Sequence, residues 1–310
     1  MEIHETVNSV YIAMDILLTG AQGFLGSVIR AELNQYKITT LGRSQLNDIS
    51  GDISKEIFAL QKFDLVIHAA GKAHSVPKTP QEGQEFFDVN FKGTANLLHS
   101  LQERPPKSFV LVSTVAVYGR DKGHMIDETH PLAANDAYGQ SKIKAEELVL
   151  RWCKQHTVTC TILRLPLIAG PNPPGNLKSM INGIKKGYYF NIGTGDTRRS
   201  LVLAQDVARI IPSAASLGGI YNLTDGHHPS FKELSDYIAL KHAYPRPKAM
   251  PYFIARLIAG LGNLMGPNAP LTSKKLDKLC SELTFDDTRA RTSLNWSPQP
   301  VLGKFIIHNK

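Results

Sequence analysis

The chain has 310 residues and a formal net charge of +8, and 42% of its residues are hydrophobic against 20% charged, enough for one large globular domain or two modest ones. Its three cysteines form no CxxC pair, which argues against a disulfide framework and a zinc site, and no metal is expected. No apolar run is long enough to span a bilayer and no signal peptide is recognisable, so we expect a cytoplasmic protein.

The excess of basic residues favours an anionic partner. The cations are scattered, and the longest groups are pairs such as Lys185-Lys186 and Arg198-Arg199. Nucleic acid is therefore not expected, and an ordinary solvated surface or a phosphorylated small molecule explains the charge.

Strand-like and helix-like segments alternate through the first two-thirds of the chain. Residues 1–13 are expected to be an N-terminal extension. The expected strands are DILLTG (15–20), KITTLGR (37–43), FDLVIHAAG (63–71), SFVLVSTVAVYG (108–119), TVTCTILRLPLIAG (157–170) and, after an irregular stretch, GGIYNLT (218–224). Helical spacing follows the first, third and fourth strands. This rhythm predicts an α/β fold of the Rossmann type, with a doubly wound parallel sheet.

The predicted division of the chain places a nucleotide-binding domain at residues 14–170, to which residues 200–225 return. A smaller, interleaved C-terminal substrate domain takes residues 171–199 and 226–310. Within it, the segment MPYFIARLIAGLGNLMG (250–266) is expected to form mostly a buried helix, with a membrane-surface helix as the alternative.

TGAQGFLG places Gly20, Gly23 and Gly26 between the first strand and the first helix. The first glycine permits a tight turn, the second lets the backbone approach a pyrophosphate, and the third allows close packing of the helix on the strand. The N-terminus of the helix offers N–H groups to the phosphates. The pattern predicts dinucleotide binding.

Arg43, in LGRS, stands where such folds usually place an acid that binds the adenine ribose. A guanidinium beside a serine suits a 2′-phosphate, so NADP(H) is favoured and NAD(H) stays possible; Arg43 stacking on adenine is the alternative. Asp52, in GDIS, is expected to accept a hydrogen bond from the adenine amino group, and its neighbour Ile53 is assigned to the same end of the site.

YGQSK places Tyr138 and Lys142 four positions apart, on one face of a helix. A free tyrosine has a pKa near 10, and a neighbouring cation lowers it toward the range useful for acid–base chemistry. Tyr138 would exchange a proton with an oxygen of the substrate. Thr114, at the end of an upstream strand, is positioned to form a hydrogen bond with that same oxygen. YxxxK alone is a weak motif, because it recurs by chance in many helices.

In combination the motifs resemble the extended short-chain dehydrogenase/reductase family, and specifically its nucleotide-sugar epimerases, reductases and dehydratases. The resemblance covers nearly the whole chain from Met14. It rests on TGAQGFLG, GDIS, HAAG, VNFKGTANLL, STVAVYG, YGQSK, LRLPLIAGP, GNL and RRSLVLAQDVA, in family order and spacing.

The resemblance implies roles for individual residues. Tyr138 would be the acid/base, Lys142 would bind the nicotinamide ribose and lower the pKa of the phenol, and Thr114 would align the substrate. The implied cofactor-binding residues are Gly20, Gly23, Phe24, Leu25, Gly26, Ala70, Gly71 and Asn90. The implied substrate-binding residues are Asn176 and Arg199, which would grip the diphosphate of a UDP-sugar or another nucleotide sugar. Lys72 is a further substrate-binding candidate because its loop is expected to face the substrate, with a surface or supporting role as the alternative. Relatives also imply a homodimer built from the helices that contain Phe86 and Tyr138.

Three reactions of the family compete. Dehydration is not expected, because Val115 and Ala116 stand where dehydratases carry acids. Leu167 replaces an asparagine of many epimerases, and together with Arg43 it favours a 4-ketoreductase of UDP-4-keto-6-deoxyhexosamines over a UDP-hexose 4-epimerase that retains NAD. A catalytically idle dinucleotide sensor, or a nucleic-acid-binding relative, is the remote alternative, since such proteins often lose the tyrosine or the lysine.

Overall fold

The computed structural model describes residues 14–73, 75–266, 269 and 271–305; the expected N-terminal extension, residues 1–13, lies outside the described residues. A seven-stranded sheet forms the centre, with the order β11-β7-β5-β4-β1-β2-β3 and parallel pairing throughout. Its strands are β1 (Asp15–Thr19), β2 (Lys37–Gly42), β3 (Ile49–Ser50), β4 (Leu65–His68), β5 (Ser108–Thr114), β7 (Thr159–Leu165) and β11 (Gly219–Asn222). The strand order reverses between β1 and β4, which places a ligand crevice at the carboxyl ends of these strands.

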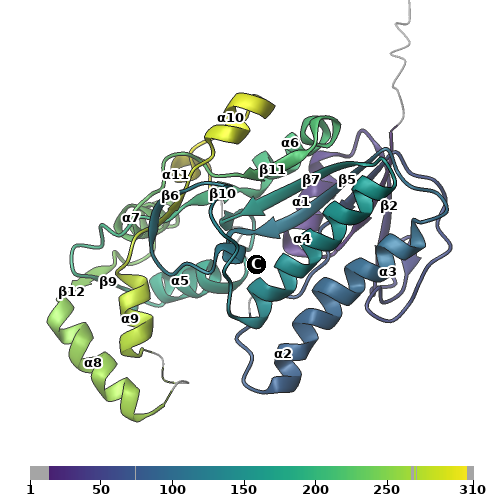
Figure 1. Cartoon of the computed structure of the whole chain (residues 1–310). Coiled ribbons are helices and arrows are strands. Elements are labelled where there is room, and N and C mark those ends of the chain that lie inside the picture. Colours follow the sequence, from purple (N-terminus) through teal and green to yellow (C-terminus); the bar gives the residue numbers. More distant parts are fainter. Residues whose placement is uncertain (1–13, 74, 267–268, 270, 306–310) are drawn as a thin grey trace, which may run out of the picture.

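Helices cover both faces of the sheet, as the alternation of segments predicts (Figure 1). One face carries α1 (Phe24–Glu32) and α6 (Ala204–Leu217), and the other carries α3 (Gly93–Ser100) and α4 (Ala137–Gln155). The short helix α2 (Pro80–Phe86) leads through a π-helical turn, η1 (Phe87–Lys92), into α3, and a 3-10 turn, η2 (Val115–Tyr118), follows β5. The predicted Rossmann-type doubly wound sheet is confirmed.

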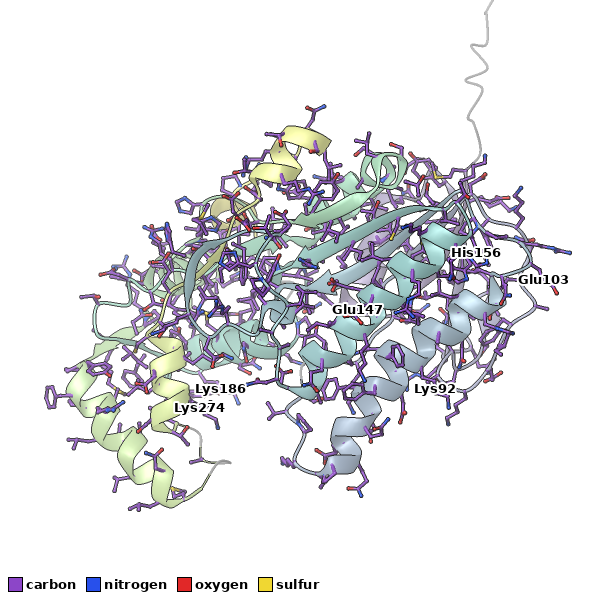
Figure 2. All side chains as sticks on the ribbon, in the orientation of Figure 1. Lys92, Glu103, Glu147, His156, Lys186 and Lys274 are labelled. Carbon is purple, nitrogen blue, oxygen red and sulfur yellow. The ribbon has the colours of Figure 1, made fainter. Side chains whose placement is uncertain are left out.

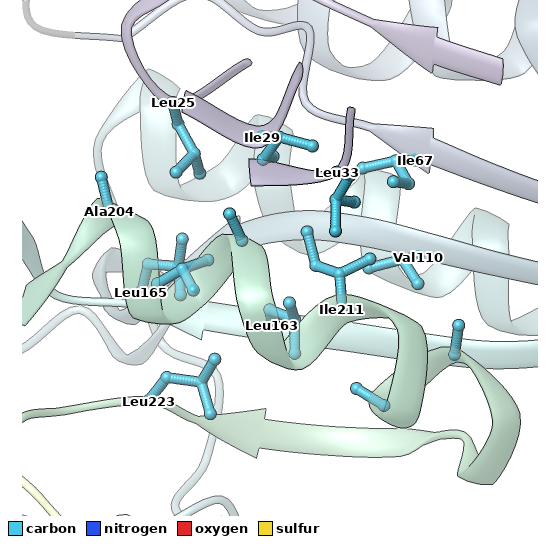
Figure 3. Close-up of a cluster of buried hydrophobic side chains, with 14 of the residues drawn as sticks. Leu25, Ile29, Leu33, Ile67, Val110, Leu163, Leu165, Ala204, Ile211 and Leu223 are labelled. Carbon is cyan, nitrogen blue, oxygen red and sulfur yellow. The ribbon is translucent and has the colours of Figure 1, made fainter. Parts of the chain in front are cut away.

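Each sheet face packs a separate hydrophobic core, because alternate strand residues point to opposite sides. In β1, Ile16 and Leu18 face the α1–α6 side, whereas Leu17 faces the α3–α4 side. Figure 3 shows the first core, which contains Leu25 and Ile29 of α1 and Ile211 of α6. This packing on both faces fixes the carboxyl ends of the strands, where the site lies.

The remaining elements form smaller sheets and helices, most of them beyond residue 166. The strands pair in parallel as β8 (Leu167–Ala169) with β10 (Leu201–Leu203), β9 (Phe190–Ile192) with β12 (Lys248–Met250), and β6 (Gly123–Ile126) with β13 (Leu283–Phe285). The helices are α5 (Gly175–Lys185), α7 (Phe231–Lys241), α8 (Tyr252–Leu264), α9 (Ser273–Leu279), α10 (Thr288–Leu294) and α11 (Val301–Lys304). Strand β11 returns to the main sheet, while the division into two domains stays a prediction.

The segment 250–266 forms α8, but the expectation that it is mostly buried is wrong. Only Ala255, Ala259 and Gly262 of this helix are buried, and its large apolar side chains are exposed. Figure 1 shows α8 as an outlying helix, in contact with α9. Within the described residues, no helix combines the length and the apolar character needed to cross a bilayer.

Candidate active site

The glycine-rich turn after β1 has no room for a side chain at Gly20 or Gly26. Gly20 has φ +75°, and a Cβ there would lie 2.6 Å from the nitrogen of Ala70. A Cβ on Gly26 would lie 2.1 Å from the carbonyl oxygen of Gly20, so α1 rests directly on the turn. Gly23 caps α1 without any side-chain hydrogen bond, which leaves N–H groups of the first helical turn available to an anion. This cradle fits a dinucleotide pyrophosphate.

Gly26→Ala is expected to weaken binding of a nicotinamide dinucleotide by roughly tenfold, the effect of about 1.4 kcal/mol. The added methyl group would push α1 off the turn, which should also cost about 1–3 kcal/mol of unfolding free energy. Fluorescence titration and urea denaturation measure the two effects. The matched control is Gly260→Ala in α8, where a Cβ meets no atom within 4 Å. Unchanged affinity in Gly26→Ala would contradict the assignment of the cradle.

Two cavities of about 570 and 630 Å³ meet at the glycine-rich turn. Both are lined by Gly20, Gly23, Ala69, Ala70 and Gly71, so together they form one long cleft. The first also contains Phe24, Leu25, Gly26, Lys72, Asn90, Thr114, Tyr138 and Lys142 from the predicted set, and the second contains Arg43, Asp52 and Ile53. The cleft thus joins the expected adenosine end to the expected chemical end.

At the adenosine end, Arg43 is exposed and lies beside Ser44 along the wall of the second cavity. Burial opposes ionisation of Asp52, but hydrogen bonds from Ser54 and the charge of Arg43 lower its pKa overall. One oxygen of Asp52 accepts bonds from the Ser54 hydroxyl, at 2.7 Å, and from the Ser54 backbone nitrogen, at 3.0 Å. The guanidinium is therefore available to a phosphate, and Asp52 keeps its second oxygen for a donor.

At the chemical end, α4 presents Tyr138 and Lys142 to the cavity. Asp136 caps the helix by accepting a 2.9 Å hydrogen bond from the backbone nitrogen of Gly139, which fixes Tyr138 in the first turn. The Thr114 hydroxyl, at the end of β5, lies close enough to the phenol to lower its pKa. Lys142 is buried one turn later, and its Nζ donates to the carbonyl oxygen of Val112 at 2.7 Å. The three side chains expected to act together are brought together.

The expected lowering of the pKa of Tyr138 by Lys142 is not found. Burial raises the pKa of the phenol, and the nearby Thr114 hydroxyl offsets this only in part. Burial also lowers the pKa of Lys142 to about 8, against the opposing charge of Glu146. The physical reason is that burial removes water from the phenolate of Tyr138 and from the ammonium of Lys142. This destabilises each charged form by more than the neighbouring groups stabilise it. Burial therefore favours the protonated form of the Tyr138 phenol.

Asn90 fixes the loop that follows β4. Its Oδ1 accepts from the backbone nitrogen of Lys72 at 2.7 Å, and its Nδ2 donates to the carbonyl of Lys72 and to the hydroxyl of Ser141. Asn90 is buried in the π-helical turn η1, a distortion that is frequent at functional sites. The asparagine thus ties the Gly71–Lys72 wall of the cleft to α4, the helix that carries Tyr138 and Lys142.

A buried ionic network behind α4 was not anticipated from the sequence. Glu146 lies one turn after Lys142, is buried, and pairs with Arg164 of β7 at 2.8 Å. Glu146 also accepts a hydrogen bond from Ser113, the neighbour of Thr114, and Arg164 donates to the hydroxyl of Tyr118 at 3.1 Å. The sequence offered one signal for this network. Glu146 falls on the buried face of α4, and a buried carboxylate requires a cationic or hydrogen-bonding partner.

The three expected substrate residues are placed differently. Lys72 lines the first cavity and pairs with Glu85. Asn176 is exposed at the start of α5 and is not among the side chains that line the described cavities. Arg199 is half-buried and donates to the backbone carbonyl of Lys278, a residue that does line the cavity. Lys72 therefore borders the space for a substrate, Arg199 lies one residue away from it, and contact of Asn176 with substrate stays a prediction.

Comparisons with known proteins agree with this geometry. Residues 16–223 match the NAD dependent epimerase/dehydratase family. The chain is 27% identical to an N-acetyl-α-D-glucosaminyl-diphospho-ditrans,octacis-undecaprenol 4-epimerase of Escherichia coli O157:H7, over 90% of this chain and 89% of the relative. It is also 27% identical to a UDP-glucose 4-epimerase of Vibrio cholerae, over 93% and 92% of the two chains.

Solved structures share the fold. The UDP-glucuronic acid 4-epimerase of Bacillus cereus in complex with NAD superposes with a TM-score of 0.74 at 20% identity, covering 94% of this chain and 96% of that one. RMD of Pseudomonas aeruginosa, complexed with NADPH, gives a TM-score of 0.71 at 21% identity with the same coverage.

Proposed function

We propose that this chain, which belongs to the NAD dependent epimerase/dehydratase family, reduces the 4-keto group of a UDP-4-keto-6-deoxyhexosamine with NADPH. The observation that carries the proposal is the phenol of Tyr138, which lines the same cavity as Thr114 and is kept protonated by burial, at one end of a cleft that has a dinucleotide cradle at its middle. A protonated phenol is the form that can donate a proton to a carbonyl oxygen.

The side chains divide the work. A reduced nicotinamide, when bound, supplies the hydride that adds to C4 of the sugar. Tyr138 donates its proton to the carbonyl oxygen, so that the ketone becomes a secondary alcohol, and the Thr114 hydroxyl aligns the same oxygen. The ammonium of Lys142 would hold the nicotinamide ribose and stabilise the phenolate that remains after proton transfer. Val115 and Ala116 line the cavity beside Thr114 and cannot transfer protons, which supports reduction over dehydration.

A 4-epimerase is the second candidate function. It is favoured by the two curated relatives, both named as 4-epimerases and aligned over about nine-tenths of this chain. The same three residues would serve it, with Tyr138 removing and returning the proton of the C4 hydroxyl. A retained NAD distinguishes it from a reductase, which must exchange its cofactor at each turnover.

Cofactor analysis separates the two functions. For the reductase we expect the purified protein to carry less than stoichiometric dinucleotide, to bind NADPH more tightly than NADH, and to consume NADPH with the keto sugar. Stoichiometric NAD that survives purification, together with interconversion of UDP-hexose epimers, would overturn the reductase in favour of the epimerase.

The preference for NADPH is expected to depend on Arg43. Arg43→Glu should raise the Kd for NADPH by about 10- to 100-fold, the usual worth of hydrogen bonds to a charged group, and change the Kd for NADH much less. Isothermal titration with both cofactors measures the two constants. Lys55→Glu is the matched control, because this neighbouring cation does not line the cavity. Equal effects of Arg43→Glu on both cofactors would contradict recognition of a 2′-phosphate.

The homodimer and the cytoplasmic location expected from the sequence remain proposals. The same holds for the contact of Asn176 and Arg199 with a diphosphate. A sugar diphosphate is common to nucleotide sugars and to the polyprenyl-linked sugar named in the Escherichia coli relative, so either kind of carrier is compatible with the proposed reaction.

A further inference from the structure

Helix α8 buries its small residues and exposes its large apolar residues, whereas an ordinary surface helix buries its large apolar residues. Its small residues, Ala255, Ala259 and Gly262, are buried, where they pack toward Leu276 of α9 and the backbone around Leu271. Its large apolar side chains face outward. Their exposed fractions are 66% for Phe253, 67% for Leu257, 65% for Leu261 and 86% for Leu264, followed by 74% for Met265.

The exposed side chains form one continuous stripe. At about 100° per residue, Phe253, Leu257, Leu261 and Leu264 fall on the side of the helix opposite to the buried alanines. Ile254 and Ile258 widen the stripe on one flank, and both are also exposed. A contiguous apolar surface of this kind marks an interaction site and is not the scattered exposure of a typical soluble surface.

The same part of the chain carries most of its excess positive charge. Residues 241–280 contain seven cationic side chains, Lys241, Arg246, Lys248, Arg256, Lys274, Lys275 and Lys278, against one acidic side chain, Asp277. All seven cationic residues are exposed. Within the described part of the chain, only Arg256 and Lys278 of these seven form ion pairs, with Asp277 and Asp121. Figure 2 shows Lys274 on α9, the helix that packs against α8.

We propose that the outer face of α8, with this surrounding set of cations, docks onto an anionic lipid bilayer. A helix that exposes bulky apolar residues beside lysine and arginine lies in the plane of the headgroups, with its apolar side in the acyl boundary. Each nearby cation adds to the attraction of a negatively charged leaflet. With 13 residues, α8 is about 20 Å long, so it lies on the membrane and does not cross it.

Charge argues for lipid and against a second copy of the chain as the occupant. Two copies that met through α8 would bring two sets of uncompensated cations together, which costs free energy. An anionic leaflet neutralises them. Docking also has a consequence for the cleft: Lys278 of α9 lines the first cavity, so a docked α8–α9 pair holds the candidate active site beside the headgroups.

Vesicle flotation tests the proposal. The full-length protein is mixed with vesicles of phosphatidylcholine alone, or with an equimolar mixture of phosphatidylcholine and phosphatidylglycerol. We expect the protein to float with the anionic vesicles only. High salt should release part of the bound protein, because it screens the attraction between the cations and the lipid headgroups. Leu257→Ser with Leu261→Ser should weaken this binding roughly tenfold or more, because two apolar side chains no longer enter the acyl boundary.

Matched variants separate the docking face from general surface effects. The apolar control is Leu217→Ser with Leu240→Ser, whose side chains are 61% and 75% exposed on α6 and α7. The charge variant is Lys248→Glu with Lys274→Glu, and its control is Lys62→Glu with Lys154→Glu, near the amino-terminal edge of the sheet. Both α8-region variants should lose flotation, and both controls should keep it.

Three results would overturn the proposal. They are absence of wild-type flotation on anionic vesicles, flotation that survives both α8-region variants, and a change of oligomeric state in Leu257→Ser with Leu261→Ser while vesicle binding persists. The last would assign the face to self-association. Circular dichroism of each variant confirms that the fold is kept.

Discussion

Replacement of Tyr138 by phenylalanine is expected to lower kcat by about 10²- to 10⁴-fold, the usual contribution of a positioned general acid. The ring would keep its contact with Phe86, whose centroid lies 5.9 Å away, so the shape of the cleft should be preserved. Affinity for the nicotinamide dinucleotide should therefore change little. Steady-state kinetics with the keto sugar and a cofactor titration measure the two effects. Equal loss of turnover and of cofactor affinity would indicate structural damage and contradict the assigned role.

The dependence of kcat/KM on pH gives an independent check on the roles of Tyr138 and Lys142. Tyr138 has a raised pKa and stays protonated through the neutral range, so it does not limit the reductive rate there. Lys142 has a pKa lowered to about 8, and its charge is present below that pH and lost above it. The value of kcat/KM is therefore expected to fall as the pH rises through about 8. Lys142→Arg should move this limb beyond the measured range, since arginine stays charged.

The sheet was predictable because its signals are local. Buried parallel strands read as apolar runs such as LVIH, and the glycine-rich turn identifies the first crossover by spacing alone. The same holds for Thr114, Tyr138 and Lys142. Two of them lie on one helix face and the third ends a strand at the edge where a doubly wound sheet places its chemistry.

The features that were missed depend on tertiary packing. Glu146 and Arg164 are 18 positions apart, and only the packing of α4 on β7 brings them together. The exposure of α8 could not be read from its composition, because an apolar helix with small residues at three- and four-residue spacing suits a core equally well. The pKa of Tyr138 is raised and not lowered as expected, because the sequence shows the neighbouring cation, Lys142, but does not show that the phenol is buried away from water.

Replacement of Arg164 by methionine is expected to lower the free energy of unfolding by about 3–5 kcal/mol, since it leaves the buried carboxylate of Glu146 without its cation. Tyr118 would keep its 2.8 Å hydrogen bond to Asn222, so the loss should come mainly from the ion pair. Urea denaturation measures it. The control is Arg256→Met, which removes the 2.9 Å but solvent-exposed partner of Asp277 and should cost no more than about 1 kcal/mol.

A double replacement separates the ion pair from simple loss of packing. Glu146→Leu combined with Arg164→Met removes both charges and should be more stable than Arg164→Met alone, because an apolar pair needs no partner. A double variant that is less stable than either single one would contradict this account. The ion pair also affects a residue of the proposed active site, because the charge of Glu146 raises the pKa of Lys142. Glu146→Gln should therefore shift the alkaline limb of kcat/KM to lower pH, which a purely structural role of the pair would not do.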